Sequence, residues 1–304
     1  MKLGTIDIGT NTTLLLVAEG AAPQAVRVLA DRSEITRLGR GIGTDGRLHE
    51  EGIHRTLEVL RGYAALAKEH QAPLLAVGTE ALRRAPNRDD FLQPAAAILG
   101  APVEVITGTR EAELTYRAAA TSFPELSRGH LSVVDIGGGS TEVILARDGQ
   151  LESCISLPLG SVRLTEAHLR HDPPTPDEIS ALLAAIASAL AGLPRPAAGV
   201  HLVGTAGTVT SLAAMAQSLP SYDPDRVHGF RLSRAALDAE CARLGRLSQA
   251  ERERIVGLDP RRADVIFAGA NILRALAERF AVEEIRVSDR GIRWGLWFER
   301  LATR

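Results

Sequence analysis

The feature that most constrains this chain is an internal repeat with an offset of 128 residues. The segment DIGTNTTL at 7–14 returns as DIGGGSTE at 135–142, so that Asp7 aligns with Asp135. In both copies an apolar run enters an Asp-x-Gly turn and a second apolar run leaves it, a pattern typical of a β-hairpin. The repeat predicts two related α/β domains, each built around one such hairpin.

Apolar runs and helical patterns alternate along the chain, which favours mixed sheets flanked by helices. The predicted strands lie at 3–8, 14–18, 74–77, 103–106, 131–136, 143–146, 200–203 and 285–287. Helical periodicity is found at 51–70, 111–120, 179–193 and 209–217. Pro124, Ser127 and Gly129 interrupt the pattern, so we predict an N-terminal domain at 1–125 and a C-terminal domain at 126–304.

The helix that covers 179–193 has a recognisable start. Thr175 precedes Pro176, and Glu178 follows two residues later. Threonine is a good N-cap, proline suits the first helical position, and a glutamate can bond back to the cap. We therefore expect this helix to begin at Pro176.

Composition excludes several classes of protein. The 304 residues include 35 Lys plus Arg and 37 Asp plus Glu, so the formal charge of −2 gives no general attraction to nucleic acid or to a membrane surface. Two cysteines, Cys154 and Cys241, cannot form a disulfide framework, which indicates a reducing, cytoplasmic location. The apolar stretch at 181–193 falls short of the ~20 residues that a spanning helix needs. Neither Lys2 nor Lys68 lies in a Gly-Lys-Ser/Thr sequence, which excludes a Walker phosphate loop.

The first repeated turn is suited to an anion. Gly9 is followed by the small polar residues Thr10, Asn11 and Thr12, whose backbone amides can approach a phosphate closely. Asp7, at the end of the strand, would face the same phosphate through Mg²⁺ or its water ligands. An ordinary hairpin with an Asx turn is the alternative interpretation.

The second repeated turn is a stronger signal. Its candidate phosphate-binding residues are Gly137, Gly138, Gly139, Ser140 and Thr141. Three consecutive glycines are entropically costly, so the close approach of a ligand explains them better than a structural turn does. Asp135 and Glu142 add carboxylates that could hold Mg²⁺ or orient water, which makes Glu142 a metal and a catalytic candidate at once.

A third glycine turn follows the strand at 200–203. Gly204 and Gly207 flank the turn, and Thr208 precedes the helix at 209–217. Free amides at a helix N-terminus attract anions, so these three residues are further candidates for phosphate binding.

Together these turns make the sequence recognisable. The Asp-x-Gly pair with a later glycine turn resembles the actin, hexokinase and Hsp70 superfamily. Eight segments also occur in the order seen in the exopolyphosphatase and guanosine pentaphosphate phosphohydrolase family: DIGTNTTLLLV, GTEALRRAPN, ITGTREAE, DIGGGSTEV, SLPLGSVRLTE, GTAGTVTSLAA, YDPDRVHG and VSDRGIRWGL. The resemblance implies an α/β fold of duplicated actin-like, ribonuclease H-like ATPase-type domains with an interdomain cleft.

The resemblance also implies an activity. Members of the family remove the terminal phosphate of inorganic polyphosphate, and some act on guanosine pentaphosphate, with Mg²⁺ as cofactor. A homodimer is likewise expected. The family's catalytic base matches Glu111, with Glu113 as the competing candidate, and Arg83 matches a phosphate-binding arginine unless it is only a solvated helix end. An ionised glutamate suits the task, because phosphoryl transfer needs positioning and charge neutralisation most.

Some positions have a less certain role or depart from the family pattern. His228 could close the cleft or serve the structure, and Arg261, Arg262 and Arg293 could bind phosphates further along a polymer, although the first two also suit a helix surface. Arg110 stands where many members have an acid, so the local charge differs there. Trp294 stands where the family usually has a glutamate, and at that position we expect local repacking and no loss of catalysis. The alternatives to hydrolysis are a sensor that binds polyphosphate or an alarmone, and an ATP-dependent kinase.

Overall fold

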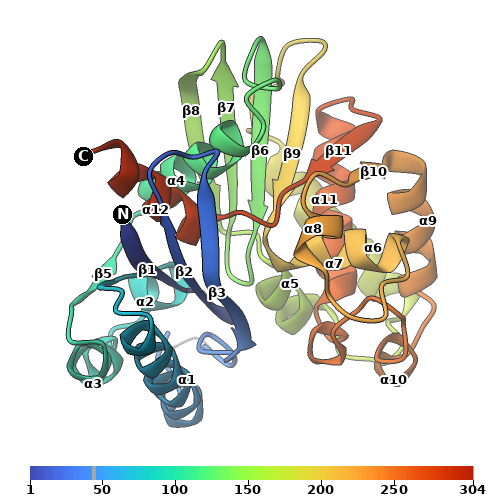
Figure 1. The fold of residues 1–304 in the computed structure, drawn as a ribbon. Coiled ribbons are helices and arrows are strands. Elements are labelled where there is room, and N and C mark those ends of the chain that lie inside the picture. The colour runs from blue at the N-terminus through green and yellow to red at the C-terminus, as the bar shows by residue number, and fades with distance from the viewer. Residues whose placement is uncertain (43–45, 304) are drawn as a thin grey trace. The chain divides into compact units, whose positions relative to one another are not determined.

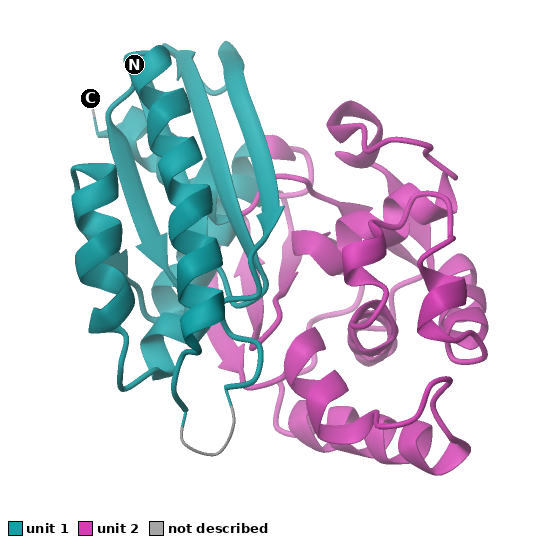
Figure 2. Ribbon diagram, turned by 90° about the horizontal axis from the view of Figure 1, so that it is seen from below, with its two compact units in different colours: residues 1–121, 292–304 teal, residues 122–291 magenta. Residues whose placement is uncertain are grey.

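The computed structural model describes residues 1–42 and 46–303. The chain divides into two compact units, coloured separately in Figure 2. Unit 1 joins Met1–Thr121 to Ile292–Arg304, and unit 2 consists of Ser122–Gly291. The first crossing between the units lies close to the predicted domain boundary, but the last segment, which the sequence placed in the second domain, belongs to unit 1.

Unit 1 contains a mixed sheet of five strands in the order β3-β2-β1-β4-β5 (Figure 1). Strands β1 to β3 form an antiparallel meander, and β4 and β5 continue from β1 in parallel. Its elements are β1 (Lys2–Ile8), β2 (Thr12–Gly20), β3 (Val26–Ile35), α1 (Glu50–Glu69), β4 (Leu74–Gly78), α2 (Glu80–Arg84), α3 (Asp89–Leu99), β5 (Val103–Val105), α4 (Gly108–Ser122) and α12 (Ile292–Ala302).

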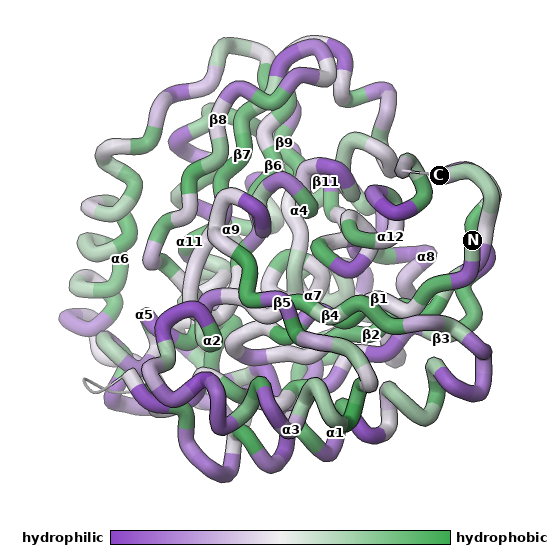
Figure 3. Tube along the Cα trace, turned by 90° about the vertical axis from the view of Figure 1, so that its left-hand side faces the viewer, coloured by the Kyte–Doolittle hydropathy of each residue, from purple (hydrophilic) through white to green (hydrophobic). Residues whose placement is uncertain are grey.

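Helices α1 and α3 cover one face of this sheet. Ile6 and Ile8, whose side chains lie on the same face of β1, join Leu60 and Tyr63 of α1 and Phe91 of α3 in a buried cluster. Figure 3 shows both helices alternating between hydrophobic and hydrophilic stretches, as expected when only one side of a helix is buried.

Helix α12 packs against the other face of the same sheet. Trp297 and Phe298 are buried with Leu3 and Leu16, and Trp297 Nε1 donates a hydrogen bond to the carbonyl of Ala18 at 3.2 Å. Burying one large apolar side chain stabilises a fold by roughly 1.5–3 kcal/mol. These aromatic contacts explain why α12 belongs to unit 1 although it follows the last strand of unit 2.

Unit 2 contains a mixed sheet of six strands in the order β10-β11-β9-β6-β7-β8. Strands β6, β9 and β11 are parallel, and β7, β8 and β10 run antiparallel to their neighbours. Its elements are β6 (His130–Ile136), β7 (Thr141–Arg147), β8 (Gln150–Leu157), α5 (Ser161–His168), α6 (Pro176–Leu190), β9 (His201–Thr205), α7 (Ala206–Ala216), α8 (Pro224–Val227), β10 (Arg231–Ser233), α9 (Arg234–Leu244), α10 (Gln249–Arg252), the 3₁₀ turn η1 (Pro260–Arg262), α11 (Ile266–Arg279) and β11 (Glu284–Val287).

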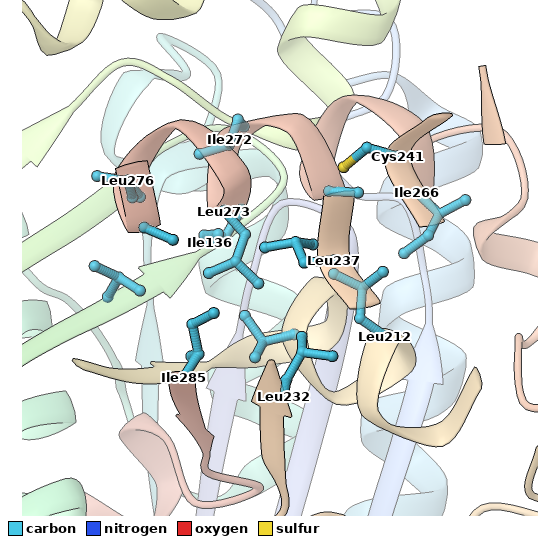
Figure 4. Packing of buried hydrophobic residues seen from close by; sticks show 14 of the residues in the cluster. Ile136, Leu212, Leu232, Leu237, Cys241, Ile266, Ile272, Leu273, Leu276 and Ile285 are labelled. Carbon is cyan, nitrogen blue, oxygen red and sulfur yellow. The ribbon is translucent and has the colours of Figure 1, made fainter. Parts of the chain in front are cut away.

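The core of unit 2 forms around α11. Figure 4 shows Leu273 and Leu276 of α11 close to Ile136 of β6, with Leu237 of α9 beside them. The predicted start of α6 is confirmed, because Thr175 accepts a hydrogen bond from the Glu178 amide while the Glu178 side chain accepts one from the Thr175 amide. Within the described residues no helix has the length and apolar composition needed to cross a membrane.

The internal repeat is confirmed in the strand pairing. Asp7 pairs with Val77 in the parallel ladder of unit 1, and Asp135 pairs with Thr205 in that of unit 2, which is the same offset of 128. All eight predicted strands are present, but β3, β8 and β10 were not predicted. The sheet edges β3 and β8 expose many of their residues and so lack the continuous apolar runs that identify central strands.

Candidate active site

The first turn, residues 9–12, accepts backbone hydrogen bonds from the segment that follows β3, residues 37–39. The turn closes through a hydrogen bond of 3.0 Å from the Gly9 amide to the Thr12 carbonyl. The carbonyl of Thr10 then accepts from the Gly39 amide at 2.8 Å, and that of Asn11 accepts from the Arg37 amide at 2.9 Å. Backbone carbonyls of the turn are therefore fixed on the side of this segment.

The predicted base lies in the first turn of α4, where the helix dipole favours a carboxylate. Glu111 is 6% exposed, and its Oε2 accepts a hydrogen bond of 3.1 Å from Arg83. The same guanidinium donates to the carbonyl of Ile106 at 2.8 Å and to Glu80 at 3.0 Å. Arg83 is thus a half-buried ion-pair partner of the predicted base and not a solvated helix end.

Two neighbouring carboxylates keep Arg83 positively charged. Burial on its own would lower the pKa of the guanidinium, but the carboxylates of Glu111 and Glu80 outweigh this effect and hold the pKa of Arg83 above its ordinary value. The pair therefore combines a fixed positive charge with a carboxylate whose orientation is fixed by an arginine.

The competing candidate, Glu113, has a different environment. Its side chain is half exposed and pairs with Arg110 at 3.4 Å. Arg110 also forms a close ion pair with Glu299 of α12, a contact that raises the pKa of Arg110 and lowers that of Glu299. The unusual Arg110 is thus matched by an acid within unit 1, and the geometry favours Glu111 over Glu113.

The second turn, residues 137–140, repeats the first. Its closing hydrogen bond runs from the Gly137 amide to the Ser140 carbonyl, again at 3.0 Å, and Ile136 pairs with Thr141 across the hairpin. Ser140 and Thr141 are both buried. The hydroxyl of Thr141 donates its single proton to the carbonyl of Leu159, so this predicted phosphate ligand serves the hairpin with its side chain.

Two predicted carboxylates lie next to each other behind this turn. Asp135 of β6 and Glu142 of β7 are direct partners in the antiparallel register, which places their side chains on one face as neighbours. Both are buried, and Ser156 donates a hydrogen bond of 2.8 Å to Glu142 Oε1. The third predicted carboxylate, Asp7, lies in unit 1.

Asp135 and Glu142 are the carboxylates of unit 2 that the sequence predicts to bind Mg²⁺. No group of three or more His, Cys, Asp or Glu side chains suited to a metal occurs within residues 1–42 and 46–303. Mg²⁺, however, is commonly held by one or two carboxylates, with water and substrate phosphates completing the shell. Asp135 and Glu142 therefore fit a substrate-dependent Mg²⁺ site better than a closed protein cage.

Close packing shapes the third turn. Gly204 lies inside β9, where a Cβ atom would be 2.9 Å from Val209 and 3.2 Å from Ile285, so close packing explains this glycine. The left-handed residue of the turn is Ala206, with φ of 68°. Thr208 is buried against Gly269 of α11. Of the three residues proposed there for phosphate, packing accounts for Gly204 and Thr208.

Gly207 has a separate role at the same place. The terminal guanidinium atoms of Arg262 lie 2.0–2.6 Å from the position that a Cβ of residue 207 would occupy, so a side chain there would displace the guanidinium from this place. Arg262 thereby brings a positive charge to the N-terminus of α7, which itself attracts anions. The sequence left Arg262 either as a ligand of distal phosphates or as a helix-surface charge, because its contact with Gly207 joins segments far apart in the chain.

Three other residues noted in the sequence, Arg293, Trp294 and His228, contact protein side chains. Arg293 is buried and pairs with Asp31 at 3.1 Å, and Trp294 is part of the apolar cluster around α12. His228 stacks on Phe123 with ring centroids 4.8 Å apart and accepts the Asp289 amide at Nδ1. Burial, with repulsion from two arginines of β11 and the following loop, lowers the pKa of His228 to about 4.

The comparisons with known proteins identify the family and the fold of this chain. A family model described as the Ppx/GppA phosphatase family matches residues 16–304. Exopolyphosphatase 2 of Mycobacterium tuberculosis is 38% identical over 312 aligned residues, which cover 97% of both chains. The structure of the Aquifex aeolicus family member has a TM-score of 0.84 at 34% identity and covers 100% of this chain and 98% of its own. An exopolyphosphatase structure from Cytophaga hutchinsonii has a TM-score of 0.91 at 26% identity, with 100% and 98% covered. The predicted α/β fold is confirmed.

Proposed function

Because this chain belongs to the Ppx/GppA phosphatase family, we propose that it is a hydrolase that releases the terminal orthophosphate of inorganic polyphosphate. The observation that carries the proposal is the buried ion pair between Glu111 and Arg83 at the start of α4. A buried carboxylate held by an arginine is suited to orienting an attacking water while the arginine neutralises phosphate charge.

In the proposed reaction Glu111 is the general base. A glutamate is ionised at neutral pH under ordinary conditions, and the hydrogen bond from Arg83 fixes the direction of one carboxylate oxygen. Orientation of water matters because a well-placed nucleophile lowers the entropic part of the barrier. Arg83, with its permanent charge, stabilises the negative charge that spreads over the transferring phosphoryl group.

The glycine turns are proposed to bind phosphate oxygens through their amides, and Arg262 beside Gly207 supplies a further cation. Asp135 and Glu142 would hold Mg²⁺, which neutralises phosphate charge when it is bound. Glu142 is also fixed by Ser156, so its position does not depend on the metal alone.

Three further parts of the proposal come from the family resemblance. Guanosine pentaphosphate is a possible second substrate, because it too ends in a phosphoanhydride. We also expect the protein to act in the cytoplasm and as a homodimer. Sedimentation as a monomer across micromolar concentrations would contradict the dimer.

The test is orthophosphate release with Mg²⁺ from long polyphosphate, short polyphosphate, guanosine pentaphosphate and ATP. We expect release from polyphosphate by the wild type and a loss of about 10²-fold or more in Glu111→Gln. Glu113→Gln is the matched control, because this exposed glutamate lies only two residues away, and it should retain wild-type turnover.

The other outcomes identify the alternatives. Loss of turnover in Glu113→Gln with retention in Glu111→Gln would assign the base to Glu113. Tight polyphosphate binding without release over hours would favour the sensor, and transfer of labelled phosphate from ATP to an acceptor would favour the kinase.

A further inference from the structure

The segment LGSVR at 159–163, part of the SLPLGSVRLTE motif, has no role in the function described so far. It lies directly against the second turn and contains the start of α5. The amide of Ser161 donates to the carbonyl of Gly137 at 3.0 Å, and the amides of Val162 and Arg163 donate to that of Gly138 at 3.0 Å. The N-terminus of α5 therefore satisfies its free amides with the carbonyls of the glycine turn.

The third carbonyl of the turn is held by a side chain. Arg163 Nε donates to the carbonyl of Gly139 at 2.8 Å. All three carbonyls from Gly137 to Gly139 are thus directed toward α5. In a trans peptide the carbonyl and the following N–H point in opposite directions, and the cis peptide identified in this chain is Asp172–Pro173, outside the turn.

The consequence concerns the amides of the turn. Those of Gly138, Gly139 and Ser140 must point away from α5, and within the described residues none of the three donates a hydrogen bond to the protein. Unused amides that point to one side of a turn are suited to binding phosphate oxygens. The carbonyl contacts made by 159–163 therefore set the direction of the proposed phosphate site.

Gly160 shows how tightly this segment fits the turn. A Cβ atom at residue 160 would lie 2.3 Å from the Gly138 oxygen and 2.5 Å from the carbonyl carbons of Gly138 and Gly139. All of these are backbone atoms, so no side-chain rotation can relieve the overlap. Only glycine permits this approach.

We propose that Arg163 is a positioning residue for phosphate hydrolysis: its Nε–H holds the Gly139 carbonyl and so aims the Ser140 amide at the terminal phosphate. The inference rests on the proposed function. It assigns to the arginine an action through the backbone and not through its charge. The carbonyls of Gly137 and Gly138 each accept a backbone amide, and that of Gly137 also accepts the Ser161 hydroxyl at 3.3 Å. The peptide between Gly139 and Ser140 is therefore the one oriented by a side chain without a backbone amide.

The test exploits the geometry of glutamine. Its Nε2 is bonded to Cδ, as Nε is in arginine, so Arg163→Gln retains a donor at the same distance from the backbone but loses the charge. Arg163→Met retains the length and loses both. We expect kcat on polyphosphate to fall about tenfold in Arg163→Met and to stay within about threefold of wild type in Arg163→Gln, with KM nearly constant in both.

Two controls separate positioning from general damage. Arg243→Met removes an exposed arginine of α9, and melting temperatures identify variants that have lost stability. Gly160→Ala should lower kcat more than Arg163→Met does, because it displaces the turn itself. Gly192→Ala is its matched control, since a Cβ there meets nothing within 4 Å.

Each outcome has a defined meaning. Equal loss in Arg163→Gln and Arg163→Met would show that the charge matters and would overturn the proposal, as would wild-type kcat in both. If the wild type released no orthophosphate, the proposed function would fail first. Calorimetric binding of inorganic phosphate then tests the turn itself: weaker binding in Arg163→Met than in Arg163→Gln supports the positioning role, and equal binding overturns it.

Discussion

The turns at 9–12 and 137–140 close with the same hydrogen bond of 3.0 Å, yet their carbonyls are held by different means. The first turn relies on two backbone amides, those of Arg37 and Gly39, and Arg37 adopts a left-handed φ of 53° to supply its own. The second relies on the start of α5 and on the side chain of Arg163.

The difference follows from the residues inside each turn. The first turn contains Thr10, Asn11 and Thr12, whose Cβ atoms restrict the backbone, whereas the second contains three consecutive glycines. Glycine loses more conformational freedom on folding than any other residue. The more flexible turn therefore needs the stronger external support, and that support comes from a helix N-terminus and an arginine.

The carboxylates provide the test with the largest expected effect. Leu14 is the counterpart of Glu142 at the offset of 128, so Glu142→Leu gives the second hairpin the residue of the first. We expect orthophosphate release to fall about 10³-fold, because the variant removes one of two adjacent carboxylates from the proposed metal site. Leu14→Met should stay near wild type. If Glu142→Leu released orthophosphate at the wild-type rate at all Mg²⁺ concentrations, the carboxylate of the second hairpin would have no role in metal binding or catalysis.

A pH dependence should distinguish unit 2 from unit 1. Burial lowers the pKa of His228 from its ordinary value of 6.5 to about 4 in the folded protein, so the unfolded chain binds the proton more readily between these values. Unit 2 should therefore lose about 2 kcal/mol of stability between pH 7.5 and pH 5. His228→Phe, which retains the stack on Phe123, should show a shallower loss in urea unfolding. An identical slope in both proteins would contradict this prediction.

Glycine substitution gives a smaller and more diagnostic effect in the first turn. A Cβ on residue 39 would lie 2.4 Å from the methyl group of Thr10, so Gly39→Ala should cost about 1–2 kcal/mol of unfolding free energy. Adding Thr10→Ser removes that methyl group and should restore part of the loss. Gly62→Ala, on an open helix surface, is the control. If Thr10→Ser did not restore stability, the overlap with the new Cβ at residue 39 would have to come from backbone atoms, as it does at Gly160.

The smallest effect is expected at the ion pair between α4 and α12. Arg110→Gln removes the contacts with Glu299 and Glu113, all of which are partly exposed. Such pairs contribute about 0.2–1 kcal/mol, so the thermal midpoint should fall by only a few degrees at low salt and by less at high salt. A loss of catalysis without a loss of stability would instead give Arg110 a role at the neighbouring Glu111.

Local patterns account for what the sequence could predict. The repeat, the central strands and the cap at Thr175 depend on residues close together in the chain, and all are present. The location of α12 in unit 1 could not be predicted in this way. Its aromatic residues indicate a buried face, but not that β1 and β2 cover it.

In the candidate site, too, local sequence patterns predict residues but not the contacts between distant segments. Motifs identified Glu111 and Arg83, yet their ion pair joins residues 28 positions apart. Glycine is ambiguous in a sequence, because a ligand, a packed neighbour or a left-handed turn can each require it. Close packing by itself explains Gly204, while Gly160 and Arg163, which hold the second turn, are identified in the sequence only as part of a family motif.

The assignment of α12 to unit 1 has a consequence for biosynthesis. Unit 2 is one continuous segment, so it can complete its core as soon as residue 291 has left the ribosome. Unit 1 is made first but lacks the helix that covers Leu3, Leu16 and Ala18 until residues 292–302 are translated. The nascent chain therefore exposes an apolar sheet face throughout the synthesis of unit 2, and the domain translated first is the last to finish folding.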